Sequence, residues 1–261
     1  MANETLPFTA HLTELRQRLI KSLVAVIIGF VVSFAFSEKL FKLLTMPLKY
    51  DLHIKLSSPY LEMLPKASPI NKLVFLAPAE AFWMHIKVSI VAGIILSIPV
   101  ILYQLWKFVG PGLLPTEKKY IGPFIVAGTG LFLLGDLFCF AIILPFAMSF
   151  LLTYKTESLI PMLSVGSYID FTLKFLLSFG MVFELPIVIL FLTKLGIVSP
   201  QTLAKNRKYA VLVAFILAAI LTPTPDAFNQ TLMAGPIIIL FEAGIIISKI
   251  FARKKASNDG D

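Results

Sequence analysis

Phe179-Gly-Met-Val-Phe-Glu-Leu-Pro186 is an apolar octapeptide that contains a single carboxylate, Glu184, and lies within the almost unbroken apolar run Phe171–Thr193. A carboxylate near the middle of a membrane-spanning helix costs roughly 2.5 to 3.5 kcal/mol on insertion scales and is normally tolerated only beside water or a polar partner. Pro186 removes a backbone donor at the same depth and weakens the helix. The octapeptide therefore indicates a membrane protein that uses a polar group inside the bilayer.

The composition of the whole chain agrees with this interpretation. Hydrophobic residues make up 57% of the 261 residues, and the mean hydropathy is +0.87. The apolar residues fall in long blocks, as in membrane spans. Cys139 is the only cysteine, which excludes a disulfide framework and a thiolate metal site. No nucleotide-binding, metalloprotease or nucleophile-elbow motif occurs, so neither an enzyme nor a cofactor is expected.

The net charge of +8 is explained by the membrane rather than by nucleic acid. The basic residues sit beside the apolar blocks, where they set orientation and contact anionic lipid headgroups. All four arginines fall on one side if six spans alternate, so we expect both termini to be cytoplasmic. The long connection from Glu38 to Glu80 also carries lysines, but long loops translocate with less regard to charge.

The predicted fold is all-α: one domain over residues 1–253 and a flexible cytoplasmic tail over 254–261. Prolines inside several spans predict a stiff, bent bundle shaped like a cup. The third span also contains Asp136. The fifth is short for a bilayer, so it must extend into its flanks or thin the membrane. The six expected spans are Leu19–Ser37, Ile86–Trp106, Ile121–Phe150, Phe171–Thr193, Tyr209–Leu221 and Leu232–Ser248.

The segment before the first span, His11–Leu19, has the pattern of an amphipathic helix. Its leucines and its charged residues separate onto two faces. A structural explanation for Glu14 is an ion pair with Arg18 at i,i+4, worth a few tenths of a kcal/mol. The turn after the second span has a structural explanation too: Thr116 fits a helix N-cap, and Glu117 would complement the helix dipole.

Five fragments, taken in order, resemble the TatC family, the multispanning core subunit of the twin-arginine protein translocase. The resemblance runs from about Pro7 to Arg253 and includes the number of spans. The family's common Thr-Pro-Pro-Asp appears here with one additional residue. The fragments are His11-Leu-Thr-Glu-Leu-Arg16, Thr45-Met-Pro-Leu48, Ile98-Pro-Val-Ile-Leu-Tyr-Gln-Leu-Trp106, Phe179-Gly-Met-Val-Phe-Glu-Leu-Pro186 and Leu221-Thr-Pro-Thr-Pro-Asp226, followed by Gln230.

The resemblance implies a receptor and scaffold in the inner membrane of a prokaryote. Members of the family recognise signal peptides with two consecutive arginines at their cytoplasmic face, and the system exports folded proteins using the proton-motive force. The implied partners are the signal peptides of folded cargo, single-span TatA/TatB-type subunits, membrane lipid and further copies of the chain. The positions that match the recognition site are Glu14 and Glu117, with Arg16 shaping it.

Glu184 has three interpretations. It could be a protonated or hydrogen-bonded acid that fills a polar gap between helices. The resemblance places it on a concave, water-accessible face used during transport or partner insertion. It could also be the coupling site of a proton-driven secondary transporter, together with Asp136, which is the main alternative function.

The resemblance implies that partners dock at the connection between the last two spans, at Thr222, Asp226 and Gln230, although Asp226 could simply cap the turn after Pro225. Pro47 and Pro186 are expected to be structural. For three further charged residues only general roles are expected: lysines that snorkel at Lys87 and Lys174, and an interhelical hydrogen bond at Glu242.

Overall fold

Long helices make up most of the chain in the computed structural model, which describes residues 8–54, 61–65, 73–110, 121–153, 162–222 and 226–258. Within these described ranges, five helices are long and apolar enough to cross a membrane, by length and composition. They confirm a polytopic membrane fold whose spans are α-helices. The long elements are α1 (Phe8–Ala35), α4 (Glu80–Val109), α5 (Ile121–Phe138) continued by η3 (Cys139–Ile143) and α6 (Leu144–Thr153), α7 (Val165–Phe183) continued by α8 (Leu185–Lys194), and α11 (Ala227–Asn258).

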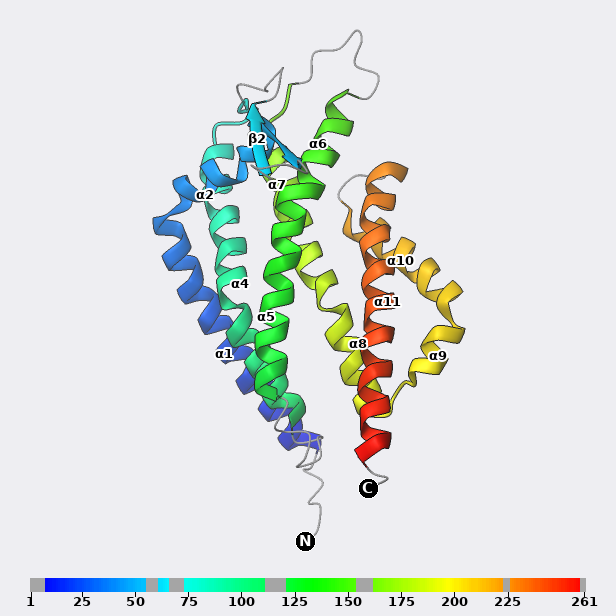
Figure 1. Cartoon of the computed structure of the whole chain (residues 1–261). Helices are drawn as coiled ribbons and strands as arrows, with labels where there is room; N and C mark the ends of the chain where they lie inside the picture. The colour runs from blue at the N-terminus through cyan, green and yellow to red at the C-terminus, as the bar shows by residue number, and fades with distance from the viewer. Residues whose placement is uncertain are drawn as a thin grey trace.

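The fifth expected span is α10 (Arg207–Leu221), which is 15 residues long and follows the short helix α9 (Pro200–Lys205). Figure 1 shows the start of α1 and the end of α11 at the same end of the bundle, here called the terminal end. The chain therefore crosses the bundle an even number of times. This requires α10 to lead away from the terminal end before α11 begins. The helix α11 also continues through 254–258 of the predicted tail.

The opposite end, here called the hairpin end, carries the short elements that follow α1 (Figure 1). They are α2 (Ser37–Leu44), α3 (Met46–Lys49), β1 (Tyr50–Ile54) and β2 (Leu61–Pro65). The strands pair antiparallel, with Tyr50 opposite Pro65 and Ile54 opposite Leu61. This hairpin was not predicted from the sequence.

Two prolines lie beside irregularities in the spans, because proline has no N–H to donate to the carbonyl four residues earlier. The interruptions expected at Pro99 and Pro236 do not occur, since α4 and α11 run through these prolines as continuous helices. The π-helical turn η3 ends at Ile143, two residues before Pro145, and accommodates the missing hydrogen bond. At Pro186 the helix is interrupted at Glu184 and starts again as α8. The Glu184 carbonyl accepts the N–H groups of Ile187 and Val188, each at 3.0 Å. The expected break therefore lies at the intramembrane carboxylate itself.

Small residues bring α1 and α4 into close contact. A Cβ added to Gly29 would lie 2.6 Å from the Gly93 carbonyl oxygen. Ser97 donates to the Ala25 carbonyl across the same crossing, at 2.9 Å. Membrane helices associate in this way because apolar burial gives little driving force between lipid-solvated helices.

The core lies in the half of the bundle nearer the hairpin end. Its buried members come from α2, α3, α7, the first turns of α4 and α11, the η3–α6 segment and α10. Fully buried aromatic side chains of α7 form its centre, notably Phe175 and Phe179. Helix α1 contributes no buried apolar side chain among those described; its apolar residues face outward, as expected beside lipid.

Candidate functional site

Glu14, a predicted recognition residue, lies near the terminal end, on the first turns of α1, which runs without a break into the first span. The Arg18 side chain donates to Glu14 Oε1 from Nη2 at 2.8 Å and from Nε at 3.3 Å. Both hydrogen bonds end on the same carboxylate oxygen. The pair is well shielded for a surface pair, with side-chain exposures of 17% for Arg18 and 21% for Glu14. The i,i+4 ion pair that was expected as the structural explanation of Glu14 is therefore present in the structure.

Helix α4 supports this pair from the side. Gln104, buried on α4, offers its side-chain oxygen to Arg18 Nη1 at the long distance of 3.5 Å. One turn further toward the terminal end of the bundle, His11 stacks on Phe108 with ring centroids 4.4 Å apart. The charged face of the predicted amphipathic segment thus packs toward α4, whereas Leu12, Leu15 and Leu19 are exposed.

Of the other two predicted members of the recognition site, the structure describes only Arg16. Arg16 is exposed on α1. Glu117 and Thr116 lie outside the described residues, in the gap between Gly110 and Ile121. The convergence of Glu14 with Glu117 therefore stays a prediction.

Glu184 lies half-buried at the break between α7 and α8, against helix α5. A Cβ added to Gly128 would lie 3.1 and 3.3 Å from its two carboxylate oxygens. The missing side chain of Gly128 is what leaves room for the carboxylate. Glu184 Oε1 is buried and has no hydrogen-bond partner among the residues that the structure describes. The site is thus a carboxylate held against α5, with one buried oxygen that can accept a hydrogen bond.

Asp136 on α5 is also buried, and neither of its oxygens has a partner within the described ranges. It lies eight residues beyond Gly128, about 12 Å along the helix axis at 1.5 Å per residue. Between them Phe132 is buried, and a Cβ at Gly180 would clash with its ring. A buried aromatic ring therefore lies between Asp136 and Gly128 along α5, and no hydrogen bond joins Asp136 to Glu184 in the described ranges.

The three predicted docking residues all make internal hydrogen bonds. Asp226 caps α11, with its Oδ1 accepting the N–H of Asn229 at 2.7 Å. Gln230 donates its side-chain amide to the Phe215 carbonyl at 3.1 Å and so ties α11 to α10. Thr222 donates to the Ala218 carbonyl at 2.8 Å at the end of α10. The structure therefore shows Asp226 as a helix cap. The docking role of Asp226, Gln230 and Thr222 stays a prediction.

Both prolines expected to be structural are buried. Pro47 lies inside α3 at the hairpin end. Pro186 lies in the first turn of α8, where a Cβ added to Gly244 of α11 would be 3.2 Å from its Cα. Pro186 therefore sets both the break at Glu184 and the close contact between α8 and α11.

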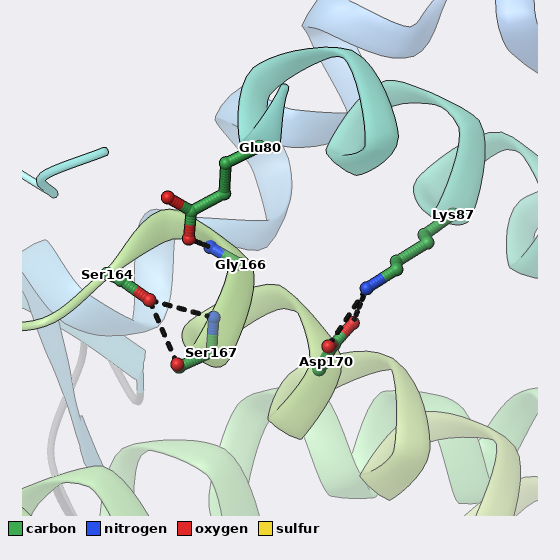
Figure 2. Close-up of polar contacts among 6 residues, drawn as sticks. All are labelled: Glu80, Lys87, Ser164, Gly166, Ser167 and Asp170. Carbon is green, nitrogen blue, oxygen red and sulfur yellow. Dashed lines mark hydrogen bonds and ion pairs between the residues drawn. The ribbon is translucent and has the colours of Figure 1, made fainter. Parts of the chain in front are cut away.

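A polar cluster at the hairpin end was not predicted from the sequence (Figure 2). Glu80, at the start of α4, accepts the N–H of Gly166 at 2.6 Å and the N–H of Leu76 at 2.7 Å. Gly166 lies in the first turn of α7, where a carboxylate also complements the helix dipole. The N-cap Ser164 accepts the N–H of Ser167 beside it, at 3.1 Å.

Two turns along α4, Lys87 forms an ion pair with Asp170 of α7 (Figure 2). Its Nζ lies 2.7 and 2.9 Å from the two carboxylate oxygens. Lys87 is therefore an interhelical partner rather than only a snorkelling lysine. The cluster borders a groove of 430 Å³ whose lining includes Trp83 and Met84.

Glu242, which the sequence left with only a general role, pairs with Arg207 across α10 and α11. Arg207 Nη2 donates to Glu242 Oε2 at 3.0 Å, and Nε donates to Oε1 at 2.5 Å. This forked pairing uses both carboxylate oxygens, unlike the pairing of Arg18 with Glu14. In the described parts of the chain, no group of three His, Cys, Asp or Glu side chains could hold a metal ion.

Comparison with known proteins gives one consistent result. Residues 10–236 match the family model described as "Sec-independent protein translocase protein (TatC)". The chain is 40% identical over 256 residues to the protein of that name from Desulforapulum autotrophicum, covering 98% of this chain and 89% of the relative. It is 41% identical over 259 residues to the one from Carboxydothermus hydrogenoformans, covering 99% of each.

Solved structures give the same result for the fold. A crystal structure described as the twin-arginine translocase receptor TatC matches with a TM-score of 0.74 and 40% sequence identity. The match covers 92% of this chain and 98% of that one. A second structure of the receptor, in the detergent DDM, matches with a TM-score of 0.75.

Proposed function

Because the chain belongs to the TatC family of Sec-independent protein translocase proteins, we propose that it is the subunit that recognises twin-arginine signal peptides. The family assignment makes it a multi-pass membrane protein of a prokaryotic protein-translocation system, working with other subunits. The observation that carries the proposal is Glu14: a shielded carboxylate at the terminal end of the bundle that is paired with a guanidinium.

The chemistry of the two basic side chains explains the preference for arginine. A guanidinium is a planar fork that can donate two parallel hydrogen bonds to one carboxylate, whereas an ammonium is a point charge. Two neighbouring carboxylates at the terminal end, Glu14 and Glu117, would therefore distinguish an Arg-Arg signal from a Lys-Lys signal. We infer that the connection carrying Glu117 folds toward Glu14, with Arg16 beside them.

We propose six spans, including α10, with the terminal end in the cytoplasm. The arginines near that end, and the even number of traverses, support this orientation. Single cysteines test it, because Cys139 is fully buried and gives a low background. An impermeant maleimide should label Met162→Cys from outside intact cells, but Ser199→Cys and Phe251→Cys only after permeabilisation. Labelling of Phe251→Cys from outside would mean that α10 does not span.

Glu184 and the α10–α11 connection are proposed as contacts for single-span TatA/TatB-type partners. Glu184 Oε1 has no hydrogen-bond partner among the described residues, and such an acceptor suits a polar group on an incoming helix, because hydrogen bonds of this kind hold membrane helices together. Around Asp226 the partner would contact a surface already fixed by internal hydrogen bonds. Further copies of this chain in the complex, and energy from the proton-motive force, belong to the same proposal.

Photo-cross-linking tests the proposed recognition site in membranes that contain the full chain. A signal peptide with a photoreactive residue beside its Arg-Arg pair should cross-link to residues 8–20 or to the segment 111–120, as located by mass spectrometry. Excess unlabelled Arg-Arg peptide should compete, and Lys-Lys peptide should not. Cross-links only to α10 or α11, or equal competition by both peptides, would contradict the proposal.

A further inference from the structure

We propose that the groove between α4 and α7 at the hairpin end binds a phospholipid whose headgroup carries a primary ammonium, such as phosphatidylethanolamine. Lys87 binds the lipid phosphate, and the carboxylates of Asp170 and Glu80 accept the ammonium. The proposal rests on the depth of the groove in the bilayer and on the number and order of its charges. It does not depend on the recognition of signal peptides.

The groove lies at the depth of the lipid headgroups. Helix α4 has 30 residues and is therefore about 45 Å long, close to the thickness of a bilayer with both headgroup layers. Its first two turns, which line the groove, consequently lie at one surface of the bilayer. The exposed indole of Trp83 on these turns fits this depth, because tryptophan is enriched at the membrane–water interface. The groove is therefore open to the headgroups of membrane lipids.

The charged residues of the groove suit a headgroup with two opposite charges. Its lining contains two carboxylates and one ammonium, so its net charge is −1. The ion pair of Lys87 with Asp170 is half-exposed, with side-chain exposures of 44% and 43%. An ammonium has three N–H donors, and Lys87 directs two of them to Asp170, which leaves one for a phosphate oxygen. The excess of negative charge favours a phospholipid that also carries a cation.

The order of these charges along α4 matches their order in the lipid. Glu80 lies at the start of the helix, and Lys87 lies two turns deeper, about 10 Å along the axis. Residues seven apart share a helix face, and both side chains reach α7 (Figure 2). Side chains lean toward the start of their helix, which brings the Lys87 ammonium closer to Glu80. In a phospholipid, likewise, the phosphate lies nearer the acyl chains and the ammonium nearer water.

Both carboxylates keep the capacity to accept a further donor. Each Glu80 oxygen accepts one backbone N–H, and a carboxylate oxygen has room for two donors. The apolar part of the lining includes the buried side chains of Met84 and Ile169. The groove volume of 430 Å³ lies within the range of small-molecule sites, about 300 to 1,000 Å³. The headgroup therefore occupies the groove, and the acyl chains remain in the bilayer.

Quenching of Trp83 fluorescence by brominated lipid tests the site in vesicles that contain the full chain. The chain has two tryptophans, and Trp106→Phe leaves Trp83, which lines the groove, as the only reporter. The vesicles are made of phosphatidylcholine brominated near the start of its acyl chains, and unbrominated lipid replaces it stepwise. Phosphatidylethanolamine should relieve the quenching at about a two- to fivefold lower mole fraction than unbrominated phosphatidylcholine, the scale of one exposed charged contact. Phosphatidylglycerol, which has the phosphate but no ammonium, should relieve it no better than phosphatidylcholine.

Variants in the same single-tryptophan protein assign the preference to the groove. Asp170→Asn should bring the preference for phosphatidylethanolamine over phosphatidylcholine close to one, whereas Asp170→Glu should keep it. Glu80→Gln, which retains an acceptor oxygen for the backbone, should lower the preference as well. The matched control is Glu38→Gln, which removes an exposed carboxylate of α2 at the same end of the bundle and should leave the preference unchanged.

Three results would overturn the inference. Equal relief by phosphatidylethanolamine and phosphatidylcholine would mean that only ordinary solvating lipid lies beside Trp83. Stronger relief by phosphatidylglycerol would mean that the groove binds the phosphate without the ammonium. A preference that persists in both Asp170→Asn and Glu80→Gln would place the selection of lipid outside the groove.

Discussion

The carboxylate of Glu80 accepts the backbone N–H of Gly166, 86 residues further along the chain, at 2.6 Å. The contact joins the first turn of α4 to the first turn of α7 at the hairpin end. Because the same carboxylate also accepts the Leu76 N–H, it fixes the chain that leads into α4. We infer that Glu80 holds the two helices in register, with Lys87 and Asp170 as a second link.

Replacing Glu80 should lower the stability of the bundle. Glu80→Ala removes the acceptor of two backbone N–H groups, whereas Glu80→Gln keeps one acceptor oxygen. The thermal midpoint of the purified protein in detergent should therefore fall most for Glu80→Ala and less for Glu80→Gln. Glu38→Ala, at an exposed position in α2, is the control and should have little effect. Equal midpoints for all three variants would show that the link does not stabilise the fold.

Gly29→Ala should separate α1 from α4. Its Cβ would lie 2.6 Å from the Gly93 carbonyl oxygen, and overpacking of this kind costs about 1 to 3 kcal/mol. Gly130→Ala on α5 is the matched control, because a Cβ there meets no atom within 4 Å. The control should be neutral or stabilising by up to about 1 kcal/mol, the difference in helix propensity. Unfolding in a detergent titration measures the stability of both variants. A neutral Gly29→Ala would contradict the expected effect of the Gly29–Gly93 contact on stability.

Gly128→Val should impair transport by displacing the Glu184 carboxylate. Its side chain would occupy the space 3.1 to 3.3 Å from the two carboxylate oxygens. Export of a folded reporter with an Arg-Arg signal should fall, as it should for Glu184→Gln, while the amount of protein in the membrane stays the same. Gly130→Val, two residues along the same helix, should export normally. If Gly128→Val exports as well as its control, the position of Glu184 against α5 has no part in transport.

Substitutions of Asp226 should separate its capping role from partner docking. Asp226→Ala removes the acceptor for the Asn229 N–H and should cost about 0.5 to 2 kcal/mol of stability, the range for lost helix caps. Asp226→Asn keeps a capping oxygen but loses the charge, so its thermal midpoint should stay near that of wild type. Recovery of partner subunits with the purified protein then tests docking. Loss of partners with Asp226→Asn would assign the charge to docking, and their retention would assign Asp226 to the cap alone.

Apolar periodicity was enough to predict the long helices, and Pro186 was enough to predict the break at Glu184. The same proline rule was wrong for α4 and α11, which run uninterrupted through Pro99 and Pro236. The hairpin β1–β2 could not be predicted in the same way. Its strands are five residues each and lie in a mixed polar connection with no strong alternation. The start of α4 at Glu80 also depends on a contact with α7 that no local pattern contains.

The ion pairs between different helices could not be predicted from the sequence. Lys87 and Asp170 are 83 residues apart, and Arg207 and Glu242 are 35 apart, so their pairing depends on how each helix is rotated and placed. The pair of Glu14 with Arg18 was predictable because i,i+4 neighbours share a helix face. The one-oxygen geometry of that pair was not, because it depends on side-chain torsions.

The affinity of the full chain for Arg-Arg and Lys-Lys signal peptides, compared between wild type and the Glu14→Gln, Glu117→Gln double variant, tests the receptor role most directly. We expect wild type to bind the Arg-Arg peptide more tightly and the double variant to lose that preference. A variant in which the exposed acid Glu38 is changed to Gln should behave as wild type. Equal affinity of wild type for the two peptides, or an unchanged preference in the double variant, would contradict signal recognition by these carboxylates.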